Sequence, residues 1–326
     1  MPKKYKLGIA FSGGGAKAAA HCGAVQALKE FGIRPDILAG TSAGSLVAAF
    51  YSAGMEPKRM IELFRGMTFF KDIVEPSSPS GGLFDSAPLL EIIRKYLPVK
   101  NFEELPIPVY AIASDMEHGK IKVFSKGELA PRLVASCSIP IVFKPIVIDG
   151  IHYIDGGVFQ NLPVPSIRNL CEKVIAFSVR RMEEEPYKPS LLATATRAYS
   201  MMFMSNIMAD SRLADLYIEL NTDGCSVYDI DNAEKLFRNG YEDACKALEN
   251  AGYTRIMEPE EIAFKEPEKY SPLEMELRER AMELREKTDQ FIDYAEDVID
   301  NYKNTLKQRR SEKRQRRCAH RNQENH

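Results

Sequence analysis

The feature that most constrains the fold is the pentapeptide Gly40-Thr41-Ser42-Ala43-Gly44, which lies between two apolar segments. Residues 37–39 predict a short buried strand before it, and residues 46–52 predict a helix that Gly54 ends. A G-x-S-x-G pentapeptide between a strand and a helix is typical of a tight turn that exposes the serine hydroxyl. Ser42 is therefore a candidate nucleophile, and a serine that merely begins a helix is the alternative interpretation.

Strand and helix patterns alternate around this turn. Residues 6–11 predict a buried strand, and residues 17–31 predict a helix that ends at Gly32. Asp149-Gly150 predicts a hairpin turn between two further strands. Strands are expected over residues 109–114, 120–124, 146–148, 151–154, 174–179 and 216–220. This alternation favours a mostly parallel sheet with helices on both faces.

A second glycine-rich string, Ser12-Gly13-Gly14-Gly15, follows the first predicted strand. The N–H groups of Gly13, Gly14 and Gly15 would lie at the start of a helix, where the helix dipole favours negative charge, so they could stabilise an oxyanion. Nucleotide binding is the alternative. The Walker A lysine and hydroxyl residue are absent, and a dinucleotide match that uses Asp36 is loose.

A serine nucleophile needs a base to accept its proton. Among the histidines, His21 falls inside a predicted helix, and His152 falls inside the predicted hairpin. Asp155, followed by Gly156-Gly157, is expected at the end of that hairpin. Asp-Gly-Gly is also an ordinary turn, but together with Ser42 it predicts a Ser-Asp dyad rather than a triad.

Three blocks, Ser12–Lys17, Gly40–Gly44 and Asp155–Gly157, occur in the order found in patatin-like phospholipases. The chain resembles that family over roughly residues 5–250, and most closely its bacterial branch. Further stretches that match the family are Gly82–Asp85, Ala135–Pro140 and Asn161–Val164.

The resemblance implies a patatin-type three-layer α/β/α sandwich with a mostly parallel central sheet, plus a C-terminal helical extension. It implies that Ser42 is the nucleophile, Asp155 the base, Gly13, Gly14 and Gly15 the oxyanion hole, and Lys17, Gly40, Gly44, Gly156 and Gly157 supporting residues. It implies a serine acyl hydrolase that releases fatty acids from phospholipid or lysophospholipid esters through an acyl-enzyme, with no metal or cofactor. A lipid-binding or scaffold protein with a vestigial site is the alternative.

The chain is expected to divide into a catalytic domain, residues 1–255, and a C-terminal extension, residues 256–326. Ser271-Pro272-Leu273-Glu274 predicts the start of a long helix, because a capping box is combined with proline at the first helical position. A heptad-like apolar stripe between Leu277 and Tyr302 then favours a homodimer.

The chain ends in a basic tail. Between residues 303 and 321, nine side chains are basic and one, Glu312, is acidic. Such a tail could bind anionic lipid headgroups or nucleic acid, or be a solvated end. It lacks interleaved aromatic residues, so no nucleic-acid partner is expected.

The start of the chain shows no signal-peptide pattern, and the six cysteines have neither metal-ligand nor redox spacing. These features predict a cytoplasmic location, with peripheral attachment to a membrane as the alternative. Two segments have open interpretations. Residues 66–88 are expected to be an irregular loop, either a substrate lid or a plain surface loop. Residues 191–208 are rich in methionine, which fits an acyl-chain surface or a buried helix.

Overall fold

The computed structural model describes residues 3–66, 75–76, 81–179, 191–225 and 232–260. The chain divides into two compact units, residues 1–270 and 271–326. The heptad stripe and the basic tail belong to the second unit and lie outside the described residues, so the dimer and the tail stay predictions. Residues 256–260 belong to the first unit, and the N–H groups of Ile256 and Met257 donate to the carbonyl of Glu30.

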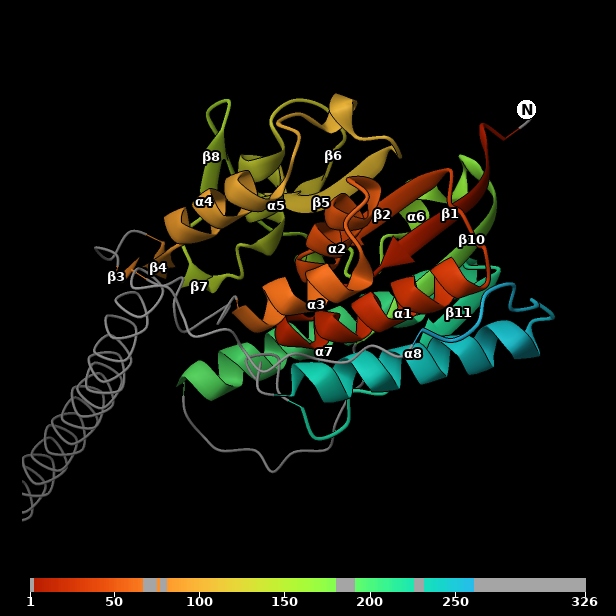
Figure 1. The fold of residues 1–326 in the computed structure, drawn as a ribbon. Coiled ribbons are helices and arrows are strands. Elements are labelled where there is room, and N and C mark those ends of the chain that lie inside the picture. Colours follow the sequence, from red (N-terminus) through yellow and green to blue (C-terminus); the bar gives the residue numbers. More distant parts are fainter. Residues whose placement is uncertain (1–2, 67–74, 77–80, 180–190, 226–231, 261–326) are drawn as a thin grey trace, which may run out of the picture. The chain divides into compact units, whose positions relative to one another are not determined.

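A mixed sheet forms the centre of the first unit (Figure 1). Five neighbouring strands, in the order β11-β10-β1-β2-β5, run parallel, and β9, β8 and β6 join the β5 side in antiparallel pairs. The sequence therefore predicts the mostly parallel sheet correctly. The bounds are β1 Tyr5–Phe11, β2 Ile37–Thr41, β5 Val109–Asp115, β6 Lys120–Phe124, β8 Ile146–Ile148, β9 Ile151–Asp155, β10 Cys171–Ser178 and β11 Leu216–Glu219.

Helices cover both faces of this sheet (Figure 1). Alternate residues of β1 point to different faces. Ile9 and Phe11 join an apolar core with α1, α2 and α8, whereas Ala10 joins a second core with α6 and α7. These two cores confirm the three-layer α/β/α sandwich. The bounds are η1 Gly15–Ala18, α1 Ala19–Glu30, α2 Ala43–Ser52, α3 Pro57–Gly66, α4 Ala87–Tyr96, α5 Leu129–Cys137, α6 Val164–Arg168, α7 Leu191–Asp210 and α8 Ala233–Asn250.

Helix α8, which the sequence analysis does not anticipate, packs its backbone directly against that of α1. A Cβ atom on Gly23 would lie 2.1 Å from the carbonyl oxygen of Phe237, and one on Gly240 would lie 2.1 Å from that of Ala20. Each helix therefore needs a glycine where the other crosses it. The distant segment 233–250 thus completes the cover over one face of the sheet.

Two segments differ from the patterns expected of them. The span 66–88 is not wholly irregular, because a second sheet pairs β3 (Glu75–Pro76), β4 (Gly82–Asp85) and β7 (Ile141–Phe143) there; residues 67–74 and 77–80 lie outside the described residues. Among the residues of helix α7 whose burial is described, Phe203 and Ile207 are buried. Its methionines Met201, Met202 and Met208 are 55%, 45% and 60% exposed, so the buried-helix interpretation is wrong for them.

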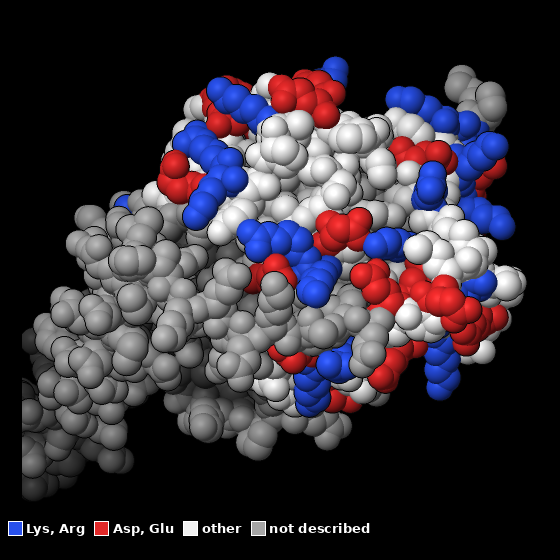
Figure 2. Space-filling view, in the orientation of Figure 1, with Lys and Arg blue, Asp and Glu red and all other residues white. Residues whose placement is uncertain are grey.

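The surface drawn in Figure 2 carries lysine and arginine side chains interspersed with aspartate and glutamate. Charges of opposite sign therefore offset each other locally on this face of the described residues. No helix within the described ranges is both long enough and apolar enough to cross a membrane.

The contact between α1 and α8 leads to a stability prediction. Gly240→Ala should lower the free energy of unfolding by about 1–3 kcal/mol, because the added methyl overpacks a backbone contact. The higher helix propensity of alanine would stabilise the variant by only about 1 kcal/mol, so the packing cost should decide the sign of the change in stability. Denaturant melts would measure the change. As a control, Glu242→Ala, at an exposed position of the same helix, should have a free energy of unfolding within about 0.5 kcal/mol of the wild type. A free energy of unfolding that Gly240→Ala leaves unchanged would contradict the close contact between α1 and α8.

Candidate active site

Ser42 occupies the turn between β2 and α2. Its backbone has φ 53° and ψ −132°, a left-handed conformation that is uncommon and strained for a residue with a side chain. Glycines on either side let the turn close. A Cβ on Gly40 would lie 2.3 Å from the carbonyl oxygen of Gly44, and one on Gly44 would lie 2.4 Å from that of Ser12. The G-x-S-x-G pattern thus forms the sharp turn that it predicts.

The serine is less accessible than the pentapeptide predicts. Ser42 is only 6% exposed. The C-terminal end of α5 and the glycine loop both contact the turn, through Ser136 and Gly13. The hydroxyl therefore lies below the surface, in surroundings of low dielectric.

Strand β5 brings Ser42 and Asp155 to the same level of the sheet. On one side of β5, Ile112 pairs with Thr41, the residue before Ser42. On the other side, the next residue, Ala113, pairs with Asp155. The two candidate catalytic residues thus flank one strand at adjacent positions.

Asp155 is buried, and Gly157 fixes its carboxylate. The side chain is 2% exposed, and its Oδ1 accepts a hydrogen bond of 2.7 Å from the N–H of Gly157. This bond makes Asp155 the N-cap of the short 3₁₀ helix Gly156–Val158. A capping bond of this kind fixes the orientation of the carboxylate at the end of β9.

The last residues of α5 link the two candidates. The N–H of Ser42 donates to Ser136 Oγ at 2.9 Å, and the N–H of Asp155 donates to the carbonyl of Ser138 at 2.8 Å. Between them, the thiol of Cys137 interacts with the hydroxyls of Ser42 and Ser45. Burial, with the charge of Asp155, raises the pKa of Cys137 well above its ordinary value, so this thiol stays protonated.

The glycine loop lies beside the serine, but its three N–H groups are not equivalent. A Cβ on Gly13 would lie 3.1 Å from Ser42 Cβ, which places the loop next to the turn. The N–H of Gly13 donates to the carbonyl of Asn161 at 3.1 Å. Gly14 and Gly15, at the start of η1, are therefore the better candidates for oxyanion donors, and Lys17 is buried in the same short helix.

Two asparagines that the sequence analysis does not single out connect the glycine loop to the Asp155 turn. The N–H of Asn161 donates to Oδ1 of Asn206 at 3.0 Å, and Nδ2 of Asn206 donates to the carbonyl of Gly157 at 2.9 Å. The stretch Asn161–Val164 is a signal for the first asparagine. The second lies on α7, and only the fold brings it here.

The histidines take up other positions. His21 is fully buried in α1, and its Nε2 donates to the carbonyl of Ser12 at 2.9 Å. Desolvation lowers its pKa to about 4, so its ring is neutral at pH 7. His152 pairs with Glu117 at 2.5 Å and is half exposed. Both arrangements favour Asp155 over a histidine as the base.

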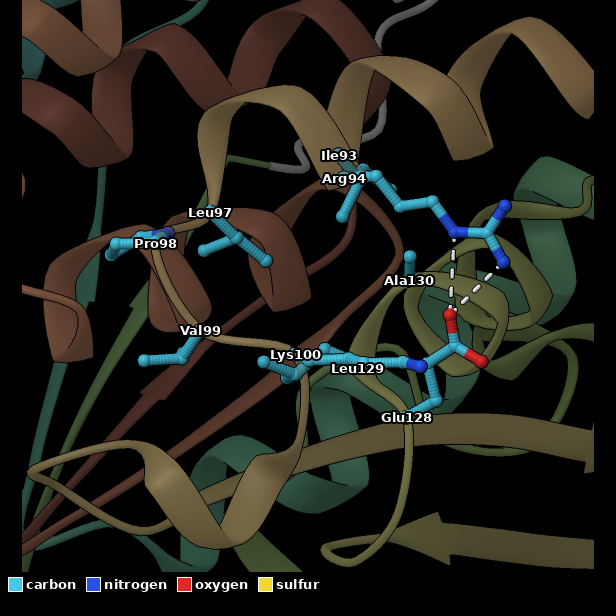
Figure 3. A pocket seen from close by; sticks show the side chains of 9 residues that line it. All are labelled: Ile93, Arg94, Leu97, Pro98, Val99, Lys100, Glu128, Leu129 and Ala130. Atoms are coloured by element: carbon cyan, nitrogen blue, oxygen red, sulfur yellow. Dashed lines mark hydrogen bonds and ion pairs between the residues drawn. The ribbon is translucent and has the colours of Figure 1, made fainter.

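A cavity of about 420 Å³ lies at the other end of α5 (Figure 3). Ile93, Leu97 and Leu129 contribute apolar side chains, and the ion pair Arg94–Glu128, 3.0 Å between Nη2 and Oε1, stands beside them. None of the site residues predicted from sequence lines it. The same helix therefore has one end at this cavity and the other at Ser42. Among the described residues, no cluster of three or more histidine, cysteine or acidic side chains could hold a metal ion.

Residues 9–167 match the family model described as Patatin-like phospholipase. These residues form a patatin-like phospholipase domain. The matched range contains the glycine loop, the Ser42 turn and Asp155, and it ends within α6.

The relatives of this patatin-like domain include bacterial and animal proteins. An uncharacterized NTE family protein of Mycobacterium tuberculosis is 32% identical over 184 residues, which are 56% of this chain and 51% of that protein. Patatin-like phospholipase domain-containing protein 6 of Homo sapiens is 28% identical over 186 residues, 55% of this chain and 14% of that protein. The chain thus spans about half the length of its mycobacterial relatives. The crystal structure of VipD from Legionella pneumophila is a distant match, with 16% identity, a TM-score of 0.45, and coverage of 76% of this chain and 67% of that one.

The buried His21 leads to a pH prediction. Its folded pKa of about 4 is below its unfolded value of 6.5, so its contribution to stability is complete above pH 6.5 and is lost as the pH falls toward 4. The loss should reach about 3 kcal/mol. Asp210 acts in the opposite sense, because burial raises its pKa to about 7. The comparison should therefore be made against His21→Gln, which cannot titrate. The stability of the wild type relative to this variant should fall between pH 7 and pH 4, and a constant difference would contradict the buried neutral ring.

Proposed function

We propose that the patatin-like domain is a serine acyl hydrolase that acts on phospholipid or lysophospholipid esters through a Ser42–Asp155 dyad. The observation that carries the proposal is the register of β5, which presents the strained Ser42 turn and the buried Asp155 on its two sides. Membership of the family supports a lipid ester as substrate.

In this mechanism, Asp155 accepts the proton of Ser42 Oγ as the oxygen attacks the ester carbonyl. The N–H groups of Gly14 and Gly15 stabilise the oxyanion of the tetrahedral intermediate. The leaving alcohol takes the proton from Asp155, and an acyl-enzyme remains on Ser42. Asp155 then accepts a proton from water, whose oxygen attacks the acyl-enzyme, and this proton returns to Ser42 Oγ as the fatty acid leaves.

Two potential nucleophiles lie in this site, and burial separates them. A cysteine attacks as the thiolate, and the raised pKa of Cys137 keeps that thiol neutral. Ser42 needs only a neighbouring base, which Asp155 supplies. The chemistry therefore belongs to the serine.

The exposed face of α7 supports a lipid-like substrate. Phe203 of this helix packs against Gly157, two residues from Asp155. The exposed Met201 and Met202 directly precede Phe203 in the same turn of the helix. Flexible, polarisable methionine side chains are suited to contact with acyl chains of varied shape.

The proposal divides the chain into a catalytic domain, residues 1–255, and an extension, residues 256–326. In the extension, the basic residues from Lys303 onward would attract anionic lipid, and the stripe from Leu277 to Tyr302 would pair two copies. The protein would then be cytoplasmic and attach to membranes at its surface.

Ser42→Ala should abolish ester hydrolysis and labelling by a fluorophosphonate probe. Loss of the nucleophile in a serine hydrolase lowers turnover by up to about 10⁶-fold. Fatty-acid release from a panel of phospholipids and lysophospholipids would measure the activity and identify the preferred headgroup. Retention of one tenth of the wild-type rate would rule out Ser42 as the nucleophile, and a wild type that takes no probe would favour a vestigial site.

The matched pair Asp155→Asn and His152→Gln tests the base in the same assays. The amide cannot accept the proton, so Asp155→Asn should be nearly as inactive as Ser42→Ala. His152→Gln removes a half-exposed ring three residues away and should leave substantial activity. The opposite ranking would replace the dyad with a histidine base.

Truncation after Tyr302 should weaken binding to vesicles that contain anionic lipid. Each basic residue near such a surface contributes about 1 kcal/mol, and salt screens the attraction. Co-sedimentation with phosphatidylglycerol vesicles at low and high salt would measure the loss, with phosphatidylcholine vesicles as the control. Equal binding by the truncated chain would remove the tail from the proposal. A monomer in light scattering for the full chain would remove the dimer.

A further inference from the structure

The strained backbone of Ser42 is held from inside and from outside its turn. The carbonyl of Ser42 accepts two hydrogen bonds from Ser45, one from its N–H at 2.8 Å and one from the Ser45 hydroxyl at 2.7 Å. The N–H of Ser42 donates to Ser136 Oγ at 2.9 Å. A left-handed conformation persists at a residue with a side chain only where the surrounding structure fixes it. Ser136, 94 residues away in the sequence, is part of that structure.

The direction of these bonds follows from chemistry. The hydroxyl of Ser136 also meets the carbonyl of Ile112 at 2.5 Å. A carbonyl can only accept, so the hydroxyl hydrogen goes to Ile112, and the oxygen lone pairs face the N–H of Ser42. Ser136 is fully buried, so water cannot easily replace either bond.

The Ser136 hydroxyl matters for the site because its second partner, Ile112, lies on β5. Ile112 pairs with Thr41, and the following residue, Ala113, pairs with Asp155. Ser136 therefore ties the turn that carries the nucleophile to the strand beside the base. A shift of the turn along β5 would break one of its two hydrogen bonds.

We propose that Ser136 is a positioning residue for hydrolysis, whose hydroxyl sets where Ser42 Oγ lies relative to Asp155. The inference rests on the proposed function, because it assumes that Ser42 is the nucleophile. Ser136 acts through the backbone of Ser42 and takes no proton itself.

The same helix end offers a matched control. Ser138 is also fully buried, and its hydroxyl donates to the carbonyl of Val134, one turn back in α5, at 2.8 Å. Only its backbone carbonyl meets Asp155. Ser138→Ala therefore removes an equally buried hydroxyl two residues away and leaves the bond to Ser42 in place.

The kinetic test uses the full chain, at a temperature below the thermal midpoint of every variant. Ser136→Ala should lower the rate of fluorophosphonate labelling and the kcat for a soluble p-nitrophenyl ester by about 10- to 100-fold, since small displacements of a reacting atom have effects of this size. The KM of Ser136→Ala should stay within about twofold of the wild type. For Ser138→Ala, the labelling rate, kcat and KM should all stay within about threefold of the wild type. Ser136→Cys, which keeps a weaker hydrogen-bonding atom, should be intermediate and serves if the alanine variant does not fold.

A second measurement is independent of activity. Exchange of the Ser42 amide hydrogen with solvent, followed by NMR, should become at least about tenfold faster in Ser136→Ala and stay unchanged in Ser138→Ala. Equal exchange in the two alanine variants, or equal labelling rates, would overturn the role of Ser136. A wild type that never labels at Ser42 would instead overturn the proposed function.

Discussion

The site depends on the two different neighbours of strand β5. Strand β2 runs parallel to it and ends opposite Ile112, whereas β9 approaches from the other direction and ends opposite Ala113. The turn after β2 carries Ser42, and the last residue of β9 is Asp155. An all-parallel sheet would not bring β9 to this level from that direction. The change from parallel to antiparallel pairing at β5 therefore places the Ser42 turn and Asp155 on its two sides at adjacent levels.

Around Ser42 and Asp155, hydrogen bonds link a group of buried polar residues. The hydroxyl of Ser136 accepts from the N–H of Ser42, and the backbone carbonyl of Ser138 accepts from the N–H of Asp155. The pair Asn161–Asn206 joins the glycine loop to the Asp155 turn. Buried polar groups are costly unless they are hydrogen-bonded. These hydrogen bonds hold the groups in one arrangement, although Oδ1 of Asn161 is buried without a hydrogen-bond partner among the described residues. Fixed dipoles in a water-poor site stabilise developing charge more strongly than solvent does.

The same burial decides which groups can react. The pKa of Cys137 rises and that of His21 falls, so both are neutral at pH 7. Removing these two groups from the ionic chemistry leaves Asp155 as the buried carboxylate beside Ser42. Environment, rather than residue type, thus underlies the proposal of an aspartate as the base in a chain that has five histidines.

The sequence by itself determined the local geometry and the sheet. The alternation of apolar strands and helices predicts the layers, and the glycines at 40 and 44 predict the sharp turn, because such features depend on neighbouring residues. Only the tertiary structure decided what touches the turn. Ser136, Asn206 and α8 meet their partners across 94, 45 and more than 200 residues, and long-range contacts leave no periodic signal in a single sequence. For the same reason the pentapeptide predicts an exposed Ser42, whereas in the fold α5 and the glycine loop contact its turn and Ser42 is 6% exposed.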